Sequence, residues 1–335
     1  MGTRKSHSVV RLARSVMRQG GAVRSLAAGT AALLLLASCT SEPAGPTAPT
    51  PSGPAAVEPD DANPALMRAT LDLRDPTRVT DPTPDSPGAD ADLGRDLPST
   101  VLYPQVDHPL PVVVFTHGLG STPEAYEELL STWALAGFFV VAPSYPLTVA
   151  GSAQVFEDVA SQPADVSFVL DQVLALDDVA GEPFEGRIDV EHVAVAGHSA
   201  GAITALGLLS SCCADERIDA AVVLAGSPLF FGGEIAATDV PTLFVHGTQD
   251  TVLPIAEARA VFDGDSGPAA FLELDRATHS TPFDDEADPH YPAVRDATTS
   301  FLQWSLLDDD AALEALRTIG SRWSGALLTG DRLTP

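Results

Sequence analysis

The feature that most constrains the fold is an alternation of short apolar runs with helical stretches from about residue 65 onward. The runs are continuous rather than alternating, which indicates strands buried on both faces. They lie at 111–116, 138–142, 192–196, 218–225, 241–246 and 270–274. Interleaved helices imply right-handed crossovers. We therefore predict an α/β fold, a doubly wound and mostly parallel sheet, over residues 65–310, followed by a helical tail at 311–335.

The charge of the chain excludes one class of partner. The protein has 18 basic and 46 acidic residues, a net charge of −28, and its single lysine is Lys5. Six of the basic residues lie within the first 38 positions, where there is no Asp or Glu. The remainder is strongly acidic and repels phosphate backbones. We expect no nucleic-acid partner and a well-solvated surface, and we expect a monomer.

The N-terminus has the pattern of an export signal. A basic segment at 1–24 precedes an apolar stretch at 25–38, which is too short to span a membrane. The sequence Leu-Ala-Ser-Cys ending at Cys39 resembles the lipobox of bacterial lipoproteins. We predict a signal peptide at 1–38, lipidation of Cys39 and a Pro/Ala/Thr-rich tether at 39–64 that holds the protein on the outer side of the cell membrane. The alternative is an ordinary cleaved signal with an incidental cysteine.

A Gly-x-Ser-x-Gly sequence spans residues 197–201 and centres on Ser199. Alone the motif is weak, but here it lies directly between a predicted strand and a predicted helix, as a nucleophile elbow requires. The tight turn needs small residues on both sides of the serine. It would also place Ser199 at a helix N-terminus, where backbone amides favour developing negative charge.

A serine nucleophile needs a histidine base and an orienting carboxylate. In a sheet of this kind they follow the serine, each on a loop after a strand. Asp250 follows the strand at 241–246, and His279 follows the strand at 270–274. We predict the triad Ser199, Asp250 and His279. The rival candidates are Asp275 and Asp284 as the acid and His290 as the base, whereas His198 and His246 have structural roles.

Two backbone amides should form the oxyanion hole. One is Ala200, directly after the nucleophile. The other lies in the glycine-containing loop at 117–121, where we choose Leu119, with Gly120 as the alternative donor and His117 as a brace for the loop. The mechanism needs no cofactor and no metal. The adjacent cysteines Cys212 and Cys213 could equally be a disulfide or two free thiols.

Together these motifs resemble bacterial α/β hydrolases of the dienelactone-hydrolase-like and platelet-activating-factor-acetylhydrolase-like type, over about residues 68–305. The resemblance is carried by the run 112–146, the segment 162–166, the elbow, the Cys-Cys pair, 246–250 and 277–280. It implies ester hydrolysis through an acyl-enzyme on Ser199. Cutinase-like polyester hydrolases are similar around Asp250 and His279, but they usually carry an aromatic residue where this chain has Leu119.

The segment at 226–240 is too short for a large cap domain, which predicts an open site for small or surface-bound esters. Phe230, Phe231 and Phe283 could form an acyl pocket, or could simply cover the core. We predict the activity of a carboxylic ester hydrolase. Alternatives are a lipase, a polyester hydrolase or a serine peptidase on the same triad, or a non-catalytic binding lipoprotein with the same fold.

Overall fold

The computed structural model describes residues 64–80, 92–232, 235–236 and 239–334. The predicted signal peptide, Cys39 and nearly all of the tether lie outside the described residues. Within the described part of the chain, no helix is long and apolar enough to cross a membrane.

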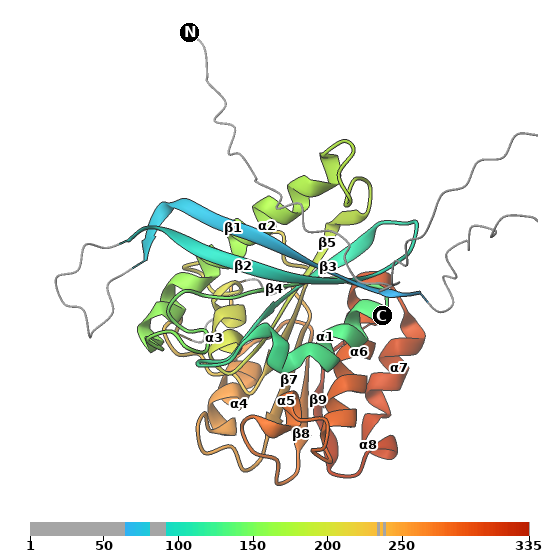
Figure 1. The fold of residues 1–335 in the computed structure, drawn as a ribbon. Helices are drawn as coiled ribbons and strands as arrows, with labels where there is room; N and C mark the ends of the chain where they lie inside the picture. The colour runs from blue at the N-terminus through green and yellow to red at the C-terminus, as the bar shows by residue number, and fades with distance from the viewer. Residues whose placement is uncertain (1–63, 81–91, 233–234, 237–238, 335) are drawn as a thin grey trace, which may run out of the picture.

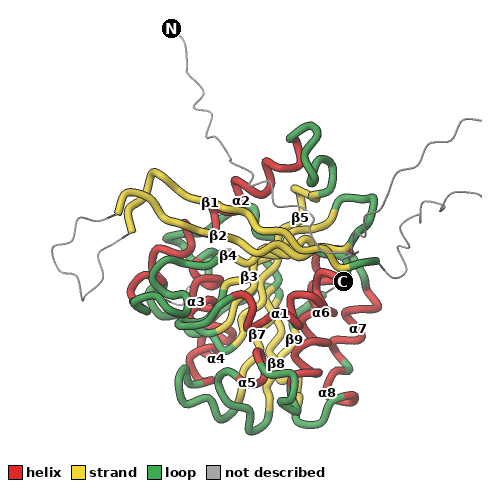
Figure 2. The backbone as a smooth tube through the Cα atoms, viewed as in Figure 1, coloured by secondary structure: helices red, strands yellow, loops and turns green. Residues whose placement is uncertain are grey.

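The described chain is built on one mixed sheet of nine strands in the order β1-β2-β4-β3-β5-β6-β7-β8-β9 (Figures 1 and 2). Their bounds are β1 Leu66–Thr80, β2 Asp92–Pro104, β3 Leu110–Thr116, β4 Phe139–Pro143, β5 Ile188–His198, β6 Ala220–Leu224, β7 Thr242–Gly247, β8 Ala269–Leu274 and β9 Ala326–Asp331. Strands β3 to β8 are mutually parallel, whereas β1, β2 and β9 each pair antiparallel with their neighbours. The predicted doubly wound, mostly parallel sheet is confirmed.

Helices cover both faces of the sheet. The α-helices are α1 Glu127–Leu135, α2 Gln162–Leu174, α3 Ala200–Gly207, α4 Ile255–Gly264, α5 Thr281–Asp284, α6 Tyr291–Leu307, α7 Asp310–Arg317 and α8 Ile319–Arg322. Three 3₁₀ helices join them: η1 Pro123–Tyr126, η2 Phe156–Ser161 and η3 Ala175–Asp178. Helices α3 and α4 lie on one side of the sheet in Figure 1, and α6 and α7 lie on the other.

The central strands show why their apolar runs are continuous. In β3, Val113 and Phe115 pack into the core beneath α1 and α6, while Val112 and Val114 face the core beneath α2 and α3. Every residue of this strand is buried. Alternate side chains therefore fill two cores at once, which is the reason that the run shows no polar alternation.

The topology places the active edge of the sheet. The chain passes from β3 to β4 on one side and then returns to β5 on the other side of β3. Neighbouring parallel strands whose crossovers run in opposite directions leave a crevice at their carboxyl ends. The loop at 117–121 and the turn at Ser199 both lie at this crevice.

The C-terminal segment differs from the prediction of a helical tail. After α7 and α8, residues 326–331 form β9, which pairs antiparallel with β8. Leu313, Leu316 and Ile319 are buried in the same core as α6. The segment is therefore an integral edge of the sheet, and the predicted boundary at residue 310 is wrong.

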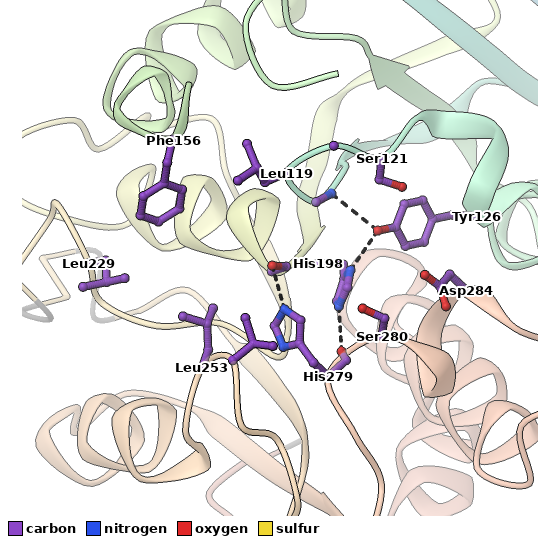
Figure 3. A pocket seen from close by; sticks show the side chains of 14 residues that line it. Leu119, Ser121, Tyr126, Phe156, His198, Leu229, Leu253, His279, Ser280 and Asp284 are labelled. Carbon is purple, nitrogen blue, oxygen red and sulfur yellow. Dashed lines mark hydrogen bonds between the residues drawn. The ribbon is translucent and has the colours of Figure 1, made fainter. Parts of the chain in front are cut away.

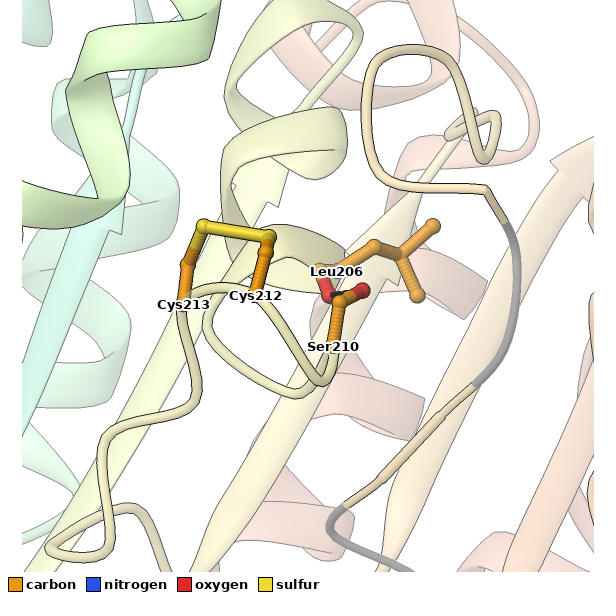
Figure 4. Close-up of a disulfide and its surroundings, with 4 residues drawn as sticks. All are labelled: Leu206, Ser210, Cys212 and Cys213. Carbon is orange, nitrogen blue, oxygen red and sulfur yellow. Dashed lines mark hydrogen bonds between the residues drawn. A yellow bond between two sulfur atoms is a disulfide. The ribbon is translucent and has the colours of Figure 1, made fainter.

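Cys212 and Cys213 form a disulfide in the loop after α3 (Figure 4). This answers the question that the sequence left open. Cys212 is exposed and Cys213 half-buried, and neither lines the cleft that holds Ser199. Between β6 and β7, the described residues of the segment 226–240 form turns and contain no helix. The predicted absence of a large cap holds for this part of the chain.

Candidate active site

Ser199 lies on the turn between β5 and α3, with the unusual backbone angles φ 56° and ψ −119°. A Cβ atom on Gly197 would lie 2.2 Å from Thr116 Oγ1, and one on Gly201 would lie 1.9 Å from the Thr116 carbonyl oxygen. Neither position can accommodate a side chain. The two glycines of the motif are therefore needed for steric reasons, because the turn packs directly against the end of β3.

The structure brings together Ser199, His279 and Asp250, which follow the ends of three strands; of these, Figure 3 labels His279. His279 Nε2 lies 2.8 Å from Ser199 Oγ, and His279 Nδ1 lies 2.6 Å from Asp250 Oδ2. Because the carboxylate accepts the Nδ1 proton, Nε2 is free to accept the proton of the serine hydroxyl. This is the geometry of a nucleophile, its base and an orienting acid.

Asp250 accepts three hydrogen bonds and has a further contact with His246, whose Nε2 also bonds to the Leu253 carbonyl at 2.8 Å. Its Oδ1 accepts from the amides of Val252 and Leu253, while Oδ2 accepts from His279 and lies 3.1 Å from His246 Nε2. Burial alone would raise the pKa of Asp250, but the hydrogen bonds from His246, His279 and the Leu253 amide outweigh it and keep the pKa well below its ordinary value. The carboxylate is therefore ionised and fixed in place for orienting the imidazole.

The rival acid and base candidates do not join this arrangement. Asp275 is exposed and pairs with Arg276, while His290 bonds to Asp288 through Nδ1. Asp284 lines the cleft, but the carboxylate that accepts the hydrogen bond from His279 Nδ1 is that of Asp250. Each rival is therefore excluded as a triad member by its position.

The two predicted oxyanion-hole donors lie beside Ser199. Ala200 is the first residue of α3, and Leu119 lies in the loop after β3 and lines the cleft. Among the described residues, neither amide has a hydrogen-bond acceptor. The alternative donor is excluded, because the Gly120 amide donates to the Thr148 carbonyl at 2.7 Å. Leu119 and Ala200 thus have amides available to a developing oxyanion.

His117 braces the oxyanion loop from below. Its Nδ1 donates to the Gly118 carbonyl at 2.8 Å, and its Nε2 accepts from the Tyr145 amide at 3.5 Å. Burial lowers the pKa of His117, so the ring stays neutral and can make one donor and one acceptor contact.

A second chain of hydrogen bonds joins the oxyanion loop to the loop of the catalytic histidine (Figure 3). His198 Nε2 donates to the His279 carbonyl at 2.8 Å, so Nδ1 accepts from the Tyr126 hydroxyl, also at 2.8 Å. The Gly118 amide donates to the same hydroxyl at 3.4 Å. Burial lowers the pKa of His198 to about 3, helped by the neighbouring His279. The ring is therefore neutral, as this hydrogen-bond pattern requires.

Ser199 opens into a cleft of about 660 Å³. One end is apolar and the other is polar, with His279 between them (Figure 3). The apolar lining residues are Leu119, Phe156, Leu229, Val252 and Leu253, and the polar ones include Ser121, Tyr126, Ser280 and Asp284.

The prediction of a phenylalanine pocket needs correction. Phe283 is fully buried, lies against the His198 ring at 5.0 Å between ring centres, and does not line the cleft. Phe231 packs beside Ala200 and Ile203 beneath the elbow. Phe230 is exposed and contacts the outer side of Phe156 at 5.2 Å. Phe156, which sequence reasoning missed, is the phenylalanine among the described residues that line the cleft.

Sequence reasoning also missed Tyr126 and Leu253. Tyr126 ends η1, eight residues after Gly118 of the oxyanion loop, and no local motif marks its contact with His198. Leu253 lies three residues after Asp250, and this proximity to a predicted triad residue was the available signal. Both residues lie on short segments without a periodic pattern, and the fold of these segments brings their side chains to the cleft.

Comparison with known proteins gives relatives in one chemical class. The sequence profile of the Chlorophyllase family matches residues 89–233, which is less than half of the chain. Cutinase est1 of Thermobifida alba is 26% identical over 231 residues, covering 68% of this chain and 72% of the relative. Cutinase cut1 of Thermobifida fusca is 28% identical over 231 residues, covering 68% of this chain and 66% of the relative.

A solved structure agrees with the fold. A ferulic acid esterase from Streptomyces cinnamoneus superposes with a TM-score of 0.61 at 20% sequence identity. The match covers 82% of this chain and 98% of that structure. At this identity the likeness establishes the architecture alone, which is that of an α/β hydrolase.

Proposed function

We propose that this carboxylic ester hydrolase of the α/β-hydrolase fold cleaves its substrates through an acyl-enzyme on Ser199, with His279 as the base and Asp250 as its orienting acid. The observation that carries the proposal is the continuous line from Ser199 Oγ through His279 to Asp250, at 2.8 Å and 2.6 Å. The similarity to proteins named cutinases supports the same reaction class.

The geometry suggests a sequence of proton transfers. As Ser199 Oγ attacks the ester carbonyl, its proton passes to His279 Nε2, and the carbonyl oxygen gains the negative charge. The amides of Leu119 and Ala200 stabilise that charge. The C–O bond to the alcohol then breaks, and the alcohol oxygen takes the proton from Nε2. Water repeats these steps on the acyl-enzyme, releasing the acid and restoring Ser199.

A labelling experiment tests the nucleophile. The purified fragment from residue 65 is incubated with a fluorophosphonate, and the modified residue is located by mass spectrometry. We expect one equivalent of label bound to Ser199 and no labelling of the Ser199→Ala variant. The His279→Ala variant should be labelled more slowly than the wild type. A folded protein that hydrolyses no p-nitrophenyl ester and takes up no label would instead support a non-catalytic binding protein.

The cleft mouth favours polyesters as a second substrate class. Leu119, Leu229, Phe230 and Val252 are large apolar side chains that are more than a third exposed, and all lie in or beside the cleft. An apolar rim of this kind can rest on an insoluble ester surface. We expect Leu229→Ser and Val252→Ser to lose erosion of a polyester film while retaining hydrolysis of a soluble short-chain ester. Equal losses on both substrates would argue against film binding.

We further propose export and lipid anchoring through Cys39, and a monomeric protein. The proposal rests on the apolar segment at 25–38 and the Cys-terminated motif that follows it. In a bacterial host, metabolic labelling with an alkyne fatty acid should mark the full-length protein, and Cys39→Ala should abolish the label. Light scattering of the fragment from residue 65 measures the oligomeric state.

A further inference from the structure

The catalytic cleft has a neighbouring cavity on its polar side. This second cavity, of about 240 Å³, shares Tyr126 and Asp284 with the cleft as common lining residues. The remaining lining residues are Glu124, Ala125, Glu127, Glu128, Phe283, Glu286 and Tyr291. We call it the acidic cavity, because five of its nine lining residues carry carboxylates.

Most of these carboxylates have no cationic partner. Glu127 pairs with Arg68. In the part of the chain that the structure describes, no arginine or histidine pairs with the other four, Glu124, Glu128, Asp284 and Glu286. Each described arginine instead forms an ion pair with a carboxylate elsewhere or with Glu127. The acidic cavity therefore keeps an uncompensated negative field beside the catalytic serine.

The titration behaviour of the lining residues agrees with crowded negative charge. Burial and the neighbouring Asp285 and Asp288 raise the pKa of Asp284, and burial together with Glu128 and Glu286 raises the pKa of Tyr291 well above its ordinary value. The Tyr291 hydroxyl is also buried, and it has no hydrogen-bond partner in the described structure. A bound cation would relieve this repulsion between negative charges. A polar group of the same ligand could form a hydrogen bond with the Tyr291 hydroxyl.

The position of the acidic cavity indicates which part of a substrate would reach it. His279 donates its proton to the departing alcohol, so the alcohol lies beside this ring. Ser280 follows His279 directly and Asp284 lies five residues after it at the end of α5, and Figure 3 shows both on the polar side with Tyr126. The apolar side chains Phe156, Leu229 and Leu253 lie at the opposite end, where they suit an acyl chain.

We propose that the acidic cavity binds a cationic group on the alcohol part of the ester, and that Asp284 is the residue that determines this specificity. The inference rests on the proposed function. An organic ammonium fits better than a metal ion, because no group of three or more His, Cys, Asp or Glu side chains in the described residues is spaced to hold a metal. A dispersed ring of carboxylates suits a diffuse charge.

A pair of matched esters tests the proposal. Butyrylcholine carries a trimethylammonium group, and 3,3-dimethylbutyl butyrate is its neutral isostere. We expect the wild-type fragment from residue 65 to favour the cationic ester in kcat/KM. Asp284→Asn should lower that preference, measured as the ratio of the two kcat/KM values, about tenfold, the effect of removing one nearby charge.

Asp285→Asn is the matched control. It removes the same charge one residue away, from a side chain that does not line either cavity. We expect it to change the preference less than twofold, which separates a local subsite from the attraction of the whole acidic surface. Tetramethylammonium should also inhibit hydrolysis of the neutral ester competitively in the wild type, and about tenfold more weakly in Asp284→Asn.

Two results would overturn the proposal. One is an equal preference for the two esters in the wild type, and the other is an equal loss of preference in Asp284→Asn and Asp285→Asn. Either result, obtained while the neutral ester is still cleaved in a Ser199-dependent manner, refutes the acidic subsite alone. Failure of the proposed function is a separate outcome, in which neither ester is hydrolysed and Ser199→Ala changes nothing.

Discussion

The imidazole of His198 donates a hydrogen bond from Nε2 to the main-chain carbonyl of His279 at 2.8 Å. The residue before the nucleophile therefore holds the backbone of the residue that activates the nucleophile. Since His198 Nδ1 accepts from Tyr126, whose hydroxyl also accepts from the Gly118 amide, the same ring connects the base to the oxyanion loop.

His198→Ala should lower kcat/KM for p-nitrophenyl butyrate about tenfold, mainly through kcat, because the base and the oxyanion loop lose their common support. The free energy of unfolding should fall by about 1–3 kcal/mol, since the buried Tyr126 hydroxyl loses its acceptor. Steady-state kinetics and urea unfolding measure the two effects. Tyr126→Phe is the companion variant, because it breaks the same chain of hydrogen bonds at the Tyr126 hydroxyl.

If the hydrogen bonds of His198 and Tyr126 act as a unit, the double variant His198→Ala/Tyr126→Phe will lose less activity than the product of the two single losses. Fully multiplicative losses would show that the two residues act independently. A wild-type kcat in His198→Ala would show that the hydrogen bond to His279 has no positioning role.

Gly201→Ala should prevent folding or destabilise the protein by more than about 4 kcal/mol, because its Cβ would lie 1.9 Å from the Thr116 carbonyl oxygen. Gly264→Ala is the matched control. A Cβ at Gly264, the last residue of α4, has no atom within 4 Å, and alanine is the better helix former. Thermal unfolding should show a neutral or slightly raised midpoint for Gly264→Ala. A stable, active Gly201→Ala variant would contradict the tight packing of the elbow on β3.

The elbow also shows what sequence could predict. Ser199 could be predicted because the steric demands on its flanking glycines act over a few residues. Asp250 and His279 could be predicted because each lies on a loop shortly after a predicted strand. Strand β9 was missed, because ALLTGD at 326–331 has a mixed polar pattern and becomes a strand only by pairing with β8. Propensity gives little information where a distant partner decides the structure.

The substrate-lining residues were harder to predict for a related reason. Phe156 reaches the cleft from η2, and Phe283 turns inward at the short helix α5 to pack under His198. Two phenylalanines on short helical segments thus differ in direction, one toward the cleft and the other toward the core. Their direction depends on backbone geometry that has no periodic sequence pattern. The buried ion pairs that Arg95 forms with Asp158 and Asp165 were equally invisible, since the partners are separated by 63 and 70 positions.

The ionised Asp215 should stabilise the fold at neutral pH, and this contribution to the free energy of unfolding should be lost in acid. Burial alone would raise the pKa of Asp215, but hydrogen bonds from Arg217 and Ser167 outweigh it and lower the pKa from 3.8 to about 2. A carboxylate with a depressed folded-state pKa stabilises the fold fully above its unfolded pKa, and that contribution disappears as the pH falls toward 2. The free-energy difference between wild type and Asp215→Asn should therefore be largest above pH 5 and shrink below pH 4.

Urea unfolding at several pH values between 7 and 3 measures this difference. Asp171→Asn is a suitable control, because Asp171 also pairs with Arg217 but is mostly exposed, so its loss should change the free energy of unfolding little. A gap between wild type and Asp215→Asn that stays constant down to pH 3 would rule out the ionised Asp215 as its source.

Arg95→Met should destabilise the protein and loosen one wall of the cleft. The Arg95 guanidinium is buried and bonds to both Asp158 on η2 and Asp165 on α2, at 2.7–2.9 Å. Removing it leaves two buried carboxylates with less compensation, at a cost of about 3–5 kcal/mol. Because η2 begins with Phe156, the substitution should also raise KM for long-chain esters more than for p-nitrophenyl acetate. Arg259→Met is the control, since its pair with Glu273 is partly exposed and lies on β8 and α4, away from η2. If Arg95→Met lowered stability without changing the chain-length dependence of KM, the buried ion pairs would support the fold without positioning Phe156.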